Sequence, residues 1–168
     1  TPSTTVDAPA QMTIGNASVT NADDIGYGTI TLAQALAVSS NTAFGQFGEE
    51  VGSDLLVKTA QKFGFGSAID TDIPHHASLM PDPDEMTTWE TAWAACGQPV
   101  GEHASPAGPQ ATVLQMAMVA SAIANDGVLE KPYFVEGVYN AQGERSFSAT
   151  PKSLGNVMSS SSAKTSPK

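Results

Sequence analysis

A serine hydroxyl and an asparagine amide two positions apart are the side chains of this sequence best suited to chemistry. Ser39 and Asn41 lie between two stretches with helical character, and Ser40 separates them. Residues two apart on a continuous helix do not share a face. If both side chains reach one cleft, the backbone must turn between them, and a corner between packed helices would hold the pair rigidly. Because Ser and Asn also favour helix caps, the pattern predicts either a reactive corner or a plain cap.

The elements that must position this corner follow from the apolar spacing. A Thr-x-x-Gln capping box at Thr31 and Gln34 predicts the start of one helix. A second helix is expected from about Thr42 to Val51. Further helices are expected over 54–63 and 88–95 and from Thr112 to Gly127, the last of them apolar nearly all round and therefore buried. Its start carries a second capping box, formed by Thr112 and Gln115.

The remaining chain predicts little regular structure. Residues 1–28 are rich in Thr, Ser, Pro, Asn and Gly and predict irregular chain with at most a short strand. Alternation over 133–139 and 145–149, with a turn at 140–143, predicts a β-hairpin. The serine-rich segment 159–168 predicts a poorly ordered tail. The expected fold is α+β and helix-rich, with one domain over 1–158.

The composition, above all the net charge, excludes some classes of binding partner. The 168 residues carry 7 Lys and Arg against 17 Asp and Glu, a formal charge of −10. Such a charge repels phosphate backbones and anionic lipids, so nucleic acid is not an expected partner. The sequence contains no apolar run of the length of about 18 residues that a membrane-spanning helix needs. Cys96 is the one cysteine, which excludes an internal disulfide, and its apolar neighbours predict a buried thiol.

Several motifs in order make the chain resemble the penicillin-binding transpeptidases. The segment 28–44 is similar to the family's stretch around its second active-site motif, Ser-x-Asn, and Phe-Gly-Phe-Gly follows at 63–66. Gly97-Gln98 resembles the family's Gly-Gln turn. The segment 111–117 resembles its Thr-Pro-Leu-Gln helix, with Val113 in place of the usual proline. The similarity continues through 124–127 and 131–135 and covers roughly residues 14–140.

The resemblance implies both a fold and a chemistry. It implies the helical subdomain of the transpeptidase fold with a short hairpin near the C-terminal end. Ser39 would relay a proton between a lysine and the leaving nitrogen, and Asn41 would hold the substrate amide and orient that lysine. Gln98 would lie close to the cleft and bind substrate, while Ser40 would point elsewhere. No cofactor or metal is implied.

The same resemblance implies a biological setting. The parent protein would cross-link peptidoglycan stem peptides ending in D-Ala-D-Ala through an acyl-serine, and would bind β-lactams. It would work at the extracytoplasmic face of a bacterial membrane, with its anchor outside this chain and other cell-wall synthesis proteins as candidate partners. Two alternatives remain: a β-lactam or muropeptide sensor, and a non-catalytic scaffold in a cell-wall complex.

Two motifs of the family are not at their expected places. A nucleophilic Ser-x-x-Lys should precede Ser39, and a Lys-Thr-Gly strand should follow the helices. The tail contains Ser161-Ser-Ala-Lys164 and the near match 164–166, but a short match within a run of serines carries little weight. We therefore expect an internal piece of a transpeptidase domain that is inactive by itself. His75, His76 and His103 lack the spacing of metal ligands on a helix and are expected as loop residues.

Overall fold

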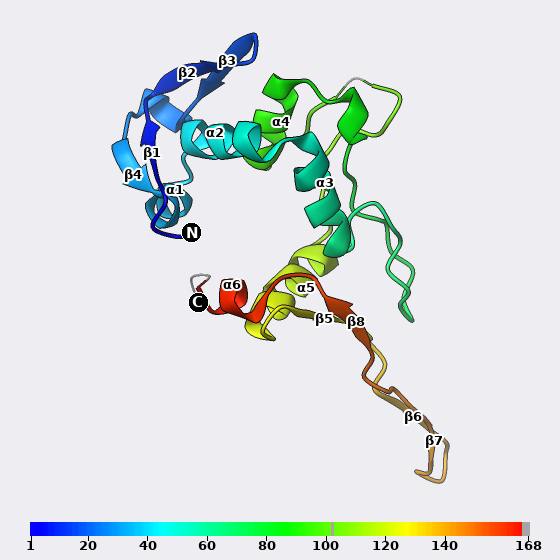
Figure 1. Ribbon diagram of the computed structural model, residues 1–168. Coiled ribbons are helices and arrows are strands. Elements are labelled where there is room, and N and C mark those ends of the chain that lie inside the picture. The colour runs from blue at the N-terminus through cyan, green and yellow to red at the C-terminus, as the bar shows by residue number, and fades with distance from the viewer. Residues whose placement is uncertain (102, 166–168) are drawn as a thin grey trace. The chain divides into compact units, whose positions relative to one another are not determined.

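The computed structural model describes residues 1–101 and 103–165 and divides them into two units (Figure 1). Unit 1 comprises 1–62 and 79–110, and unit 2 comprises 63–78 and 111–165. Both units mix helices with short two-stranded sheets, so the predicted α+β, helix-rich fold is confirmed. Among the described residues, no helix has the length and hydropathy that a membrane crossing requires.

Unit 1 joins two small antiparallel sheets to four helices. Strand β1 pairs with β4, and β2 pairs with β3 through a tight turn in which Gly15 has a φ of 61°. The expectation of at most one short strand before residue 28 was wrong, because these strands are only four residues long and bury few side chains each. The elements are β1 (Thr5–Ala8), β2 (Gln11–Ile14), β3 (Ala17–Thr20), the 3₁₀ turn η1 (Ala22–Asp24), β4 (Gly28–Thr31), α1 (Leu32–Val38), α2 (Asn41–Val51), α3 (Ser53–Lys62), the 3₁₀ turn η2 (Pro83–Glu85) and α4 (Thr88–Ala95).

Helices α2 and α4 pack closely because glycine lines their contact. A Cβ atom added at Gly48 would lie 2.5 Å from the Cβ of Ala95 and 3.1 Å from the carbonyl oxygen of Thr91. Gly45 similarly faces Ala92. Close packing of this kind leaves no room for a side chain and fixes the two helices against each other. The predicted capping box at the start of α1 is confirmed, with bonds in both directions between Thr31 and Gln34.

Unit 2 is built around helix α5 (Fig. 1). Its core contains Met118, Ala122 and Leu129, with Phe63, Ile69, Leu114 and Val157 packed around them. The prediction that this helix is buried all round was wrong: Val113 is 89% exposed and Met116 52%. The elements are α5 (Val113–Ala124), β5 (Val128–Glu130), β6 (Gly137–Tyr139), β7 (Arg145–Ser148), β8 (Ser153–Asn156) and α6 (Ser160–Thr165), with β5 paired to β8 and β6 to β7 (Figure 1).

The start of α5 departs from the predicted capping box. Thr112 accepts the backbone N–H of Gln115 at 3.1 Å, as expected. The Gln115 side chain, however, donates to the carbonyl oxygen of Phe63 at 2.5 Å, and the Thr112 N–H donates to Ser78 Oγ instead. Gln115 is fully buried, so its amide ties the start of segment 63–78 to helix α5. Sequence spacing reports only local partners and could not predict this distant one.

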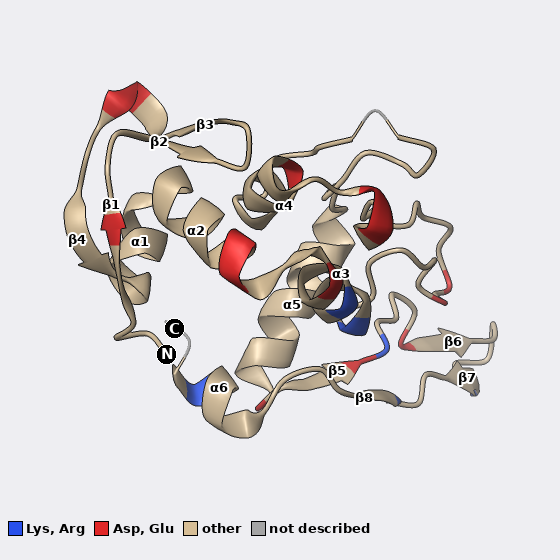
Figure 2. Ribbon diagram, turned by 45° about the horizontal axis from the view of Figure 1, so that its top comes forward, with Lys and Arg blue, Asp and Glu red and all other residues tan. Residues whose placement is uncertain are grey.

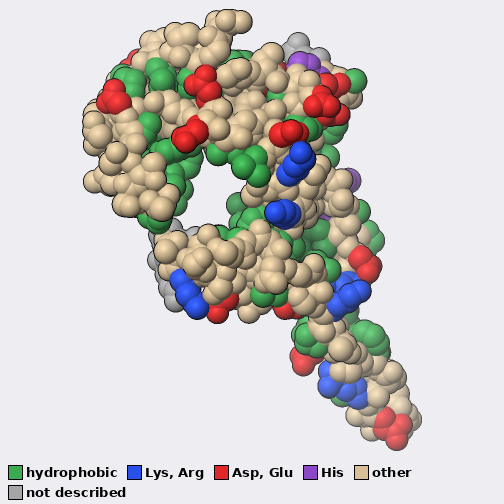
Figure 3. Space-filling view, in the orientation of Figure 1, with side chains coloured by type: hydrophobic (Ala, Val, Ile, Leu, Met, Phe, Trp, Pro, Cys, Tyr) green, Lys and Arg blue, Asp and Glu red, His purple; other side chains and the backbone are tan. Residues whose placement is uncertain are grey.

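The predicted hairpin is present, but its first strand begins four residues late. The carboxylate of Asp72 accepts the N–H groups of Phe134 and Val135, which withdraws them from strand pairing. The strands themselves are exposed, and Figure 3 shows hydrophobic side chains along this projecting hairpin. The exposed apolar residues here are Tyr133, Phe134, Val135, Val138, Tyr139 and Phe147.

The serine-rich end forms a short helix where the sequence predicts a disordered tail. Helix α6 covers Ser160–Thr165, Ser159 accepts the N–H of Ser162 at its start, and Ala163 is buried at 3% exposure. One buried methyl and a local cap suffice for one and a half turns in contact with α5. Residues 166–168 of the predicted tail lie outside the described residues.

Candidate functional site

Ser39 lies at the corner between α1 and α2. Its backbone is left-handed, with φ 53° and ψ 48°, and its side chain is exposed. This conformation ends α1 and lets α2 start two residues later in a new direction. A serine rarely occupies this region, because its Cβ crowds the following carbonyl. The corner therefore presents a hydroxyl where a plain helix end would favour glycine.

Ser40 turns inward and anchors the corner. It is fully buried, accepts the N–H of Ala43 at 3.3 Å, and donates to Asn21 Oδ1 at 3.1 Å. Asn21 Oδ1 also accepts the Thr42 N–H, while Asn21 Nδ2 donates to the carbonyl oxygens of Pro9 and Ile25. The sequence analysis missed Asn21 as the support of the corner, because nothing in the spacing links residues 21 and 40.

Asn41 begins α2 and is half-buried. Its Nδ2 donates to the carbonyl oxygen of Thr20 at 2.9 Å, which sets the orientation of the amide. Within the described residues, no group donates to Asn41 Oδ1, and none bonds to the hydroxyl of Ser39. The corner thus offers an oriented carbonyl oxygen and a hydroxyl, both able to bind an amide or a lysine ammonium.

The structure brings the segment of Gln98 to the same helix start. Cys96, just after α4, donates its thiol to the Asn41 carbonyl oxygen at 3.2 Å. Gln98 follows two residues later, with its N–H bonded to the Trp93 carbonyl oxygen and its side chain exposed. Burial raises the pKa of the Cys96 thiol to about 11, so it stays protonated at neutral pH and acts as a donor.

The three histidines lie in loops, where they form local contacts. His75 accepts the N–H of Ile69 at 3.1 Å, His76 is exposed, and His103 bonds to Glu90 at 2.7 Å. Among residues 1–101 and 103–165, no three His, Cys, Asp or Glu side chains gather as metal ligands.

The tail match to Ser-x-x-Lys lies on α6 in unit 2. Ser161 shares a hydrogen bond with Ser159, and Lys164 Nζ lies 3.9 Å from Asp126 Oδ1. No bond joins Ser161 to Lys164 in the described chain, so this pair lacks the serine–lysine contact that activates a nucleophile. Ser166, the last residue of the near match 164–166, lies outside the described residues.

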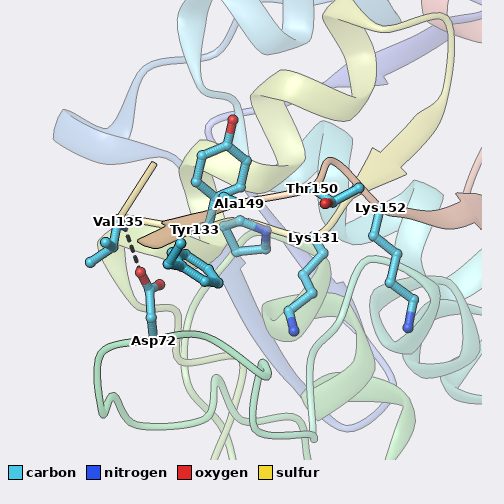
Figure 4. Close-up of a pocket in the computed structure, with 9 residues that line it drawn as sticks. Asp72, Lys131, Tyr133, Val135, Ala149, Thr150 and Lys152 are labelled. Atoms are coloured by element: carbon cyan, nitrogen blue, oxygen red, sulfur yellow. Dashed lines mark hydrogen bonds between the residues drawn. The ribbon is translucent and has the colours of Figure 1, made fainter. Parts of the chain in front are cut away.

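Unit 2 contains a separate pocket of about 230 Å³ beside the base of the hairpin (Figure 4). Lys131, Lys152, Tyr133 and Asp72 line it. Lys131 forms an ion pair with Asp70 at 2.6 Å, and the backbone N–H groups of Phe134 and Val135 lower the pKa of Asp72. The two lysines and two carboxylates balance in charge, and both carboxylates hold loop 66–78 in place. We assign this pocket a structural role.

Comparison with known proteins identifies the family. The model of the penicillin-binding protein transpeptidase domain matches residues 2–166. The peptidoglycan D,D-transpeptidase PbpA of Mycolicibacterium smegmatis is 36% identical over 111 residues, which are 66% of this chain and 21% of PbpA. The chain thus spans about a fifth of that relative.

Comparison with solved structures leads to the same family. The D,D-transpeptidase domain of a peptidoglycan glycosyltransferase from Eggerthella lenta is 51% identical, with a TM-score of 0.92, and the match covers 96% of this chain and 40% of that one. Penicillin-binding protein 3 of Mycobacterium tuberculosis, solved with aztreonam, is 26% identical with a TM-score of 0.79, over 98% and 34% of the two chains. The chain described here therefore belongs to the transpeptidase domain family of penicillin-binding proteins.

Proposed function

We propose that this chain is the helical part of a D,D-transpeptidase, with Ser39 and Asn41 as its second active-site motif. The observation that carries the proposal is the corner itself. An exposed serine adopts a left-handed backbone, and an oriented asparagine follows it on a buried hydrogen-bonded support. Uncommon backbone conformations at non-glycine residues concentrate at functional sites. A plain cap needs neither the strain nor the exposed hydroxyl.

The chemistry assigns a role to each group. A nucleophilic serine from a part of the protein outside these residues attacks the D-Ala-D-Ala amide or the β-lactam carbonyl, and a lysine accepts its proton. The Ser39 hydroxyl passes a proton from that lysine to the departing nitrogen. The products are an acyl-serine and either a free D-alanine or an opened lactam. Asn41 holds the substrate amide and the lysine in place, and Gln98 lies beside them as a substrate contact.

The setting follows from the same proposal. The partners are stem peptides of peptidoglycan, β-lactams and other proteins of cell-wall synthesis, and the location is the extracytoplasmic face of the bacterial membrane. PbpA and the E. lenta domain carry the names of enzymes of this class, and the M. tuberculosis protein was solved with a β-lactam. These likenesses support the proposal for a protein of which this chain is one part.

A substitution at Ser39 separates a catalytic role from a structural one. In the full-length gene product, Ser39→Gly removes the hydroxyl and relieves the left-handed backbone. We expect acylation by a fluorescent penicillin to slow by about 10²–10⁴-fold, the usual contribution of a positioned proton-transfer group. The thermal midpoint should stay constant or rise, because glycine adopts φ 53° freely. Asp126→Gly is the matched control, since Asp126 has a φ of 52° outside the corner.

Each outcome decides between the candidate functions. Slow acylation of Ser39→Gly with normal acylation of Asp126→Gly supports the proton relay. Labelling of Ser39→Gly at the wild-type rate contradicts it. Acylation of the wild type without any turnover of a D-Ala-D-Ala peptide indicates a sensor, and a wild type that is never acylated indicates a scaffold. The isolated 168-residue chain should not be labelled stoichiometrically.

A further inference from the structure

The two oxygens of one buried carboxylate hold two different segments of unit 1. Glu90 is 8% exposed on α4. Its Oε2 accepts the N–H and the hydroxyl of Thr87, both at 2.8 Å, and this completes the capping box at the start of the helix. Its Oε1 accepts from His103 Nε2 at 2.7 Å. The cap uses only Oε2, so the bond from Oε1 to His103 is not part of the cap.

His103 belongs to a loop whose base lies beside Gln98. Residues 100 and 108 form an antiparallel bridge, with the Val100 N–H donating to Gly108 at 2.8 Å and the reverse bond at 3.1 Å. This bridge begins two residues after Gln98. On its other side Gln98 is fixed by its N–H bond to Trp93. The position of Gln98 therefore depends on the end of α4 and on the base of the loop.

A second carboxylate holds the same loop. Glu85 Oε2 accepts the N–H and the hydroxyl of Ser105, and the Asp82 N–H donates to the same hydroxyl at 3.0 Å. These bonds lower the pKa of Glu85, with the Ser105 hydroxyl as the largest cause. Glu85 and Glu90 lie on neighbouring elements, η2 and α4, and each fixes one residue of the loop between 103 and 108.

Helix α4 also connects the Glu90–His103 hydrogen bond, called the clip below, to the Ser39–Asn41 corner. Glu90 lies near the start of α4, and Cys96 at its end donates to the Asn41 carbonyl oxygen. Gly48 of α2 leaves no space against Ala95, so α4 cannot shift without moving α2. A rigid helix thus joins a hydrogen bond at one end to the candidate substrate residues at the other.

We propose that Glu90 and His103 are positioning residues that hold Gln98 for substrate binding at the Ser39–Asn41 corner. This inference rests on the proposed function of the corner. His103 donates to Glu90, the loop is thereby fixed at 103, the bridge at 100 and 108 stays closed, and Gln98 keeps its place. Neither residue touches the substrate. Their effect is on affinity, while proton transfer at Ser39 is left unchanged.

The test uses His103→Ala in the full-length gene product, with penicillin G as the probe. This variant removes the donor to Oε1 and leaves the Thr87–Glu90 cap intact. We expect the dissociation constant for the initial penicillin complex to rise by about fivefold or more, the lower range of coupling between sites. The acylation rate constant at saturation should stay within about twofold. His103→Gln, which restores an N–H donor, should recover most of the affinity.

A second readout follows the loop directly. In His103→Ala the N–H groups of Val100 and Gly108 should exchange with deuterium faster, because their bridge opens more often. His76→Ala is the matched control, since His76 is an exposed loop histidine without a hydrogen-bond partner in the described chain. It should change neither affinity nor exchange.

The outcomes separate the inference from the proposed function. Faster exchange with unchanged penicillin affinity overturns the positioning role and leaves the corner as proposed. Unchanged exchange at both amides means that the clip does not hold the loop, and this also overturns it. A wild type that penicillin never acylates removes the proposed function and the positioning role together, while the exchange result still reports whether Glu90 and His103 fix the loop.

Discussion

Both units fix a long loop with carboxylates, but only unit 1 buries the contact. In unit 1, Glu90 is 8% exposed where it accepts from His103. In unit 2, Asp70 is 89% exposed where it pairs with Lys131. Exposed ion pairs contribute little, because solvent screens them and side-chain entropy opposes them. A buried carboxylate with all its bonds satisfied holds its partners more firmly. The candidate site therefore lies in the unit whose loop is held more rigidly.

The units also differ in charge. Residues 1–62 and 79–110 carry 11 acidic residues and two lysines, a formal −9, whereas 63–78 and 111–165 carry six acidic and four basic residues, a formal −2. In the ribbon of Figure 2, red acidic positions lie on β1, α2 and α4 and in the 3₁₀ turns of unit 1, while blue basic positions lie on α3 of unit 1 and on α6 and beside β5 and β8 in unit 2. Almost all of the net charge thus lies on the unit that contains the candidate site, which favours a substrate or partner without strong negative charge.

The largest loss of stability is expected at the buried glutamine of unit 2. Gln115→Ala leaves a cavity and an unpaired Phe63 carbonyl oxygen, and we expect the free energy of unfolding to fall by about 2–4 kcal/mol. Gln115→Met keeps the volume and should lose only about 1–2 kcal/mol. Amide hydrogen exchange on α5 measures both. Equal losses for the two variants would mean that the hydrogen bond, with no contribution from packing, supports unit 2.

A second prediction concerns the helix contact of unit 1. Gly48→Ala forces a methyl against Ala95 and Thr91, and we expect a loss of about 1–3 kcal/mol despite the better helix propensity of alanine. Tryptophan fluorescence during urea unfolding reports this unit specifically, because Trp89 and Trp93 both lie on α4. Gly45→Ala is the control, since its nearest neighbour is the flexible end of Ile14, and it should lose less. A stabilised Gly48→Ala would refute the tight contact.

The pH dependence of stability should differ between unit 1, where Glu90 accepts hydrogen bonds, and unit 2, where Asp72 does so. Burial raises the pKa of Glu90, but hydrogen bonds from Thr87 and His103 lower it by more. The N–H of Phe134 lowers the pKa of Asp72. A carboxylate whose pKa is lower in the folded state stabilises the protein above its unfolded pKa of about 4, and this contribution disappears as the pH falls through the folded value.

Urea unfolding at successive pH values from about 6 to 3 tests this expectation. Glu90→Gln should flatten the pH dependence of unit 1, and Asp72→Asn should flatten that of unit 2 by a smaller amount, because Asp72 is exposed to screening solvent. If Asp72→Asn flattened the pH dependence more than Glu90→Gln, the exposed carboxylate of unit 2 would contribute more to stability than the buried one of unit 1.

The smallest effect is expected on the hairpin. Phe147 is 51% exposed, pairs with Val138 across the two strands and borders the small pocket of unit 2. Phe147→Ser should therefore lower the stability of unit 2 by less than about 1 kcal/mol. Exchange of the amides in β6 and β7 measures it. A loss above 2 kcal/mol would show that the hairpin is a packed part of unit 2.

Sequence patterns within a few residues predicted the helices and their caps well, but they did not predict the hydrogen bonds between residues far apart in the sequence. The cap at Thr31, the corner at Ser39–Asn41 and the helix over 88–95 follow from side chains within four residues of one another, and the structure contains all three. The partners of Gln115 and Asn41 lie 52 and 21 residues away. Neither propensity nor periodicity carries information at that range. The left-handed backbone of Ser39 was also beyond the pattern, because serine does not favour it.

The exposed side of α5 teaches a related lesson. Its sequence is apolar on both sides, and this pattern predicted burial all round. The structure covers only the side of Met118 and Ala122 and leaves Val113 and Met116 open. Hydrophobicity indicates that a surface favours contact, but it does not say which residues supply that contact. The role of Ser39 stays a prediction that the Ser39→Gly variant tests, the role of Gln98 is tested through His103→Ala, and the role of Asn41 stays a prediction.

The half-buried thiol of Cys96 makes the chain suited to spectroscopic labelling. With its pKa raised to about 11 and its S–H donating a hydrogen bond to the backbone carbonyl oxygen of Asn41, this sulfur reacts slowly with maleimides at neutral pH. It is also the only cysteine in the sequence. A cysteine introduced on an exposed surface of each unit would accept a spin label or fluorophore selectively, without first removing the native residue. Distances between such labels would measure how the two units are arranged in solution.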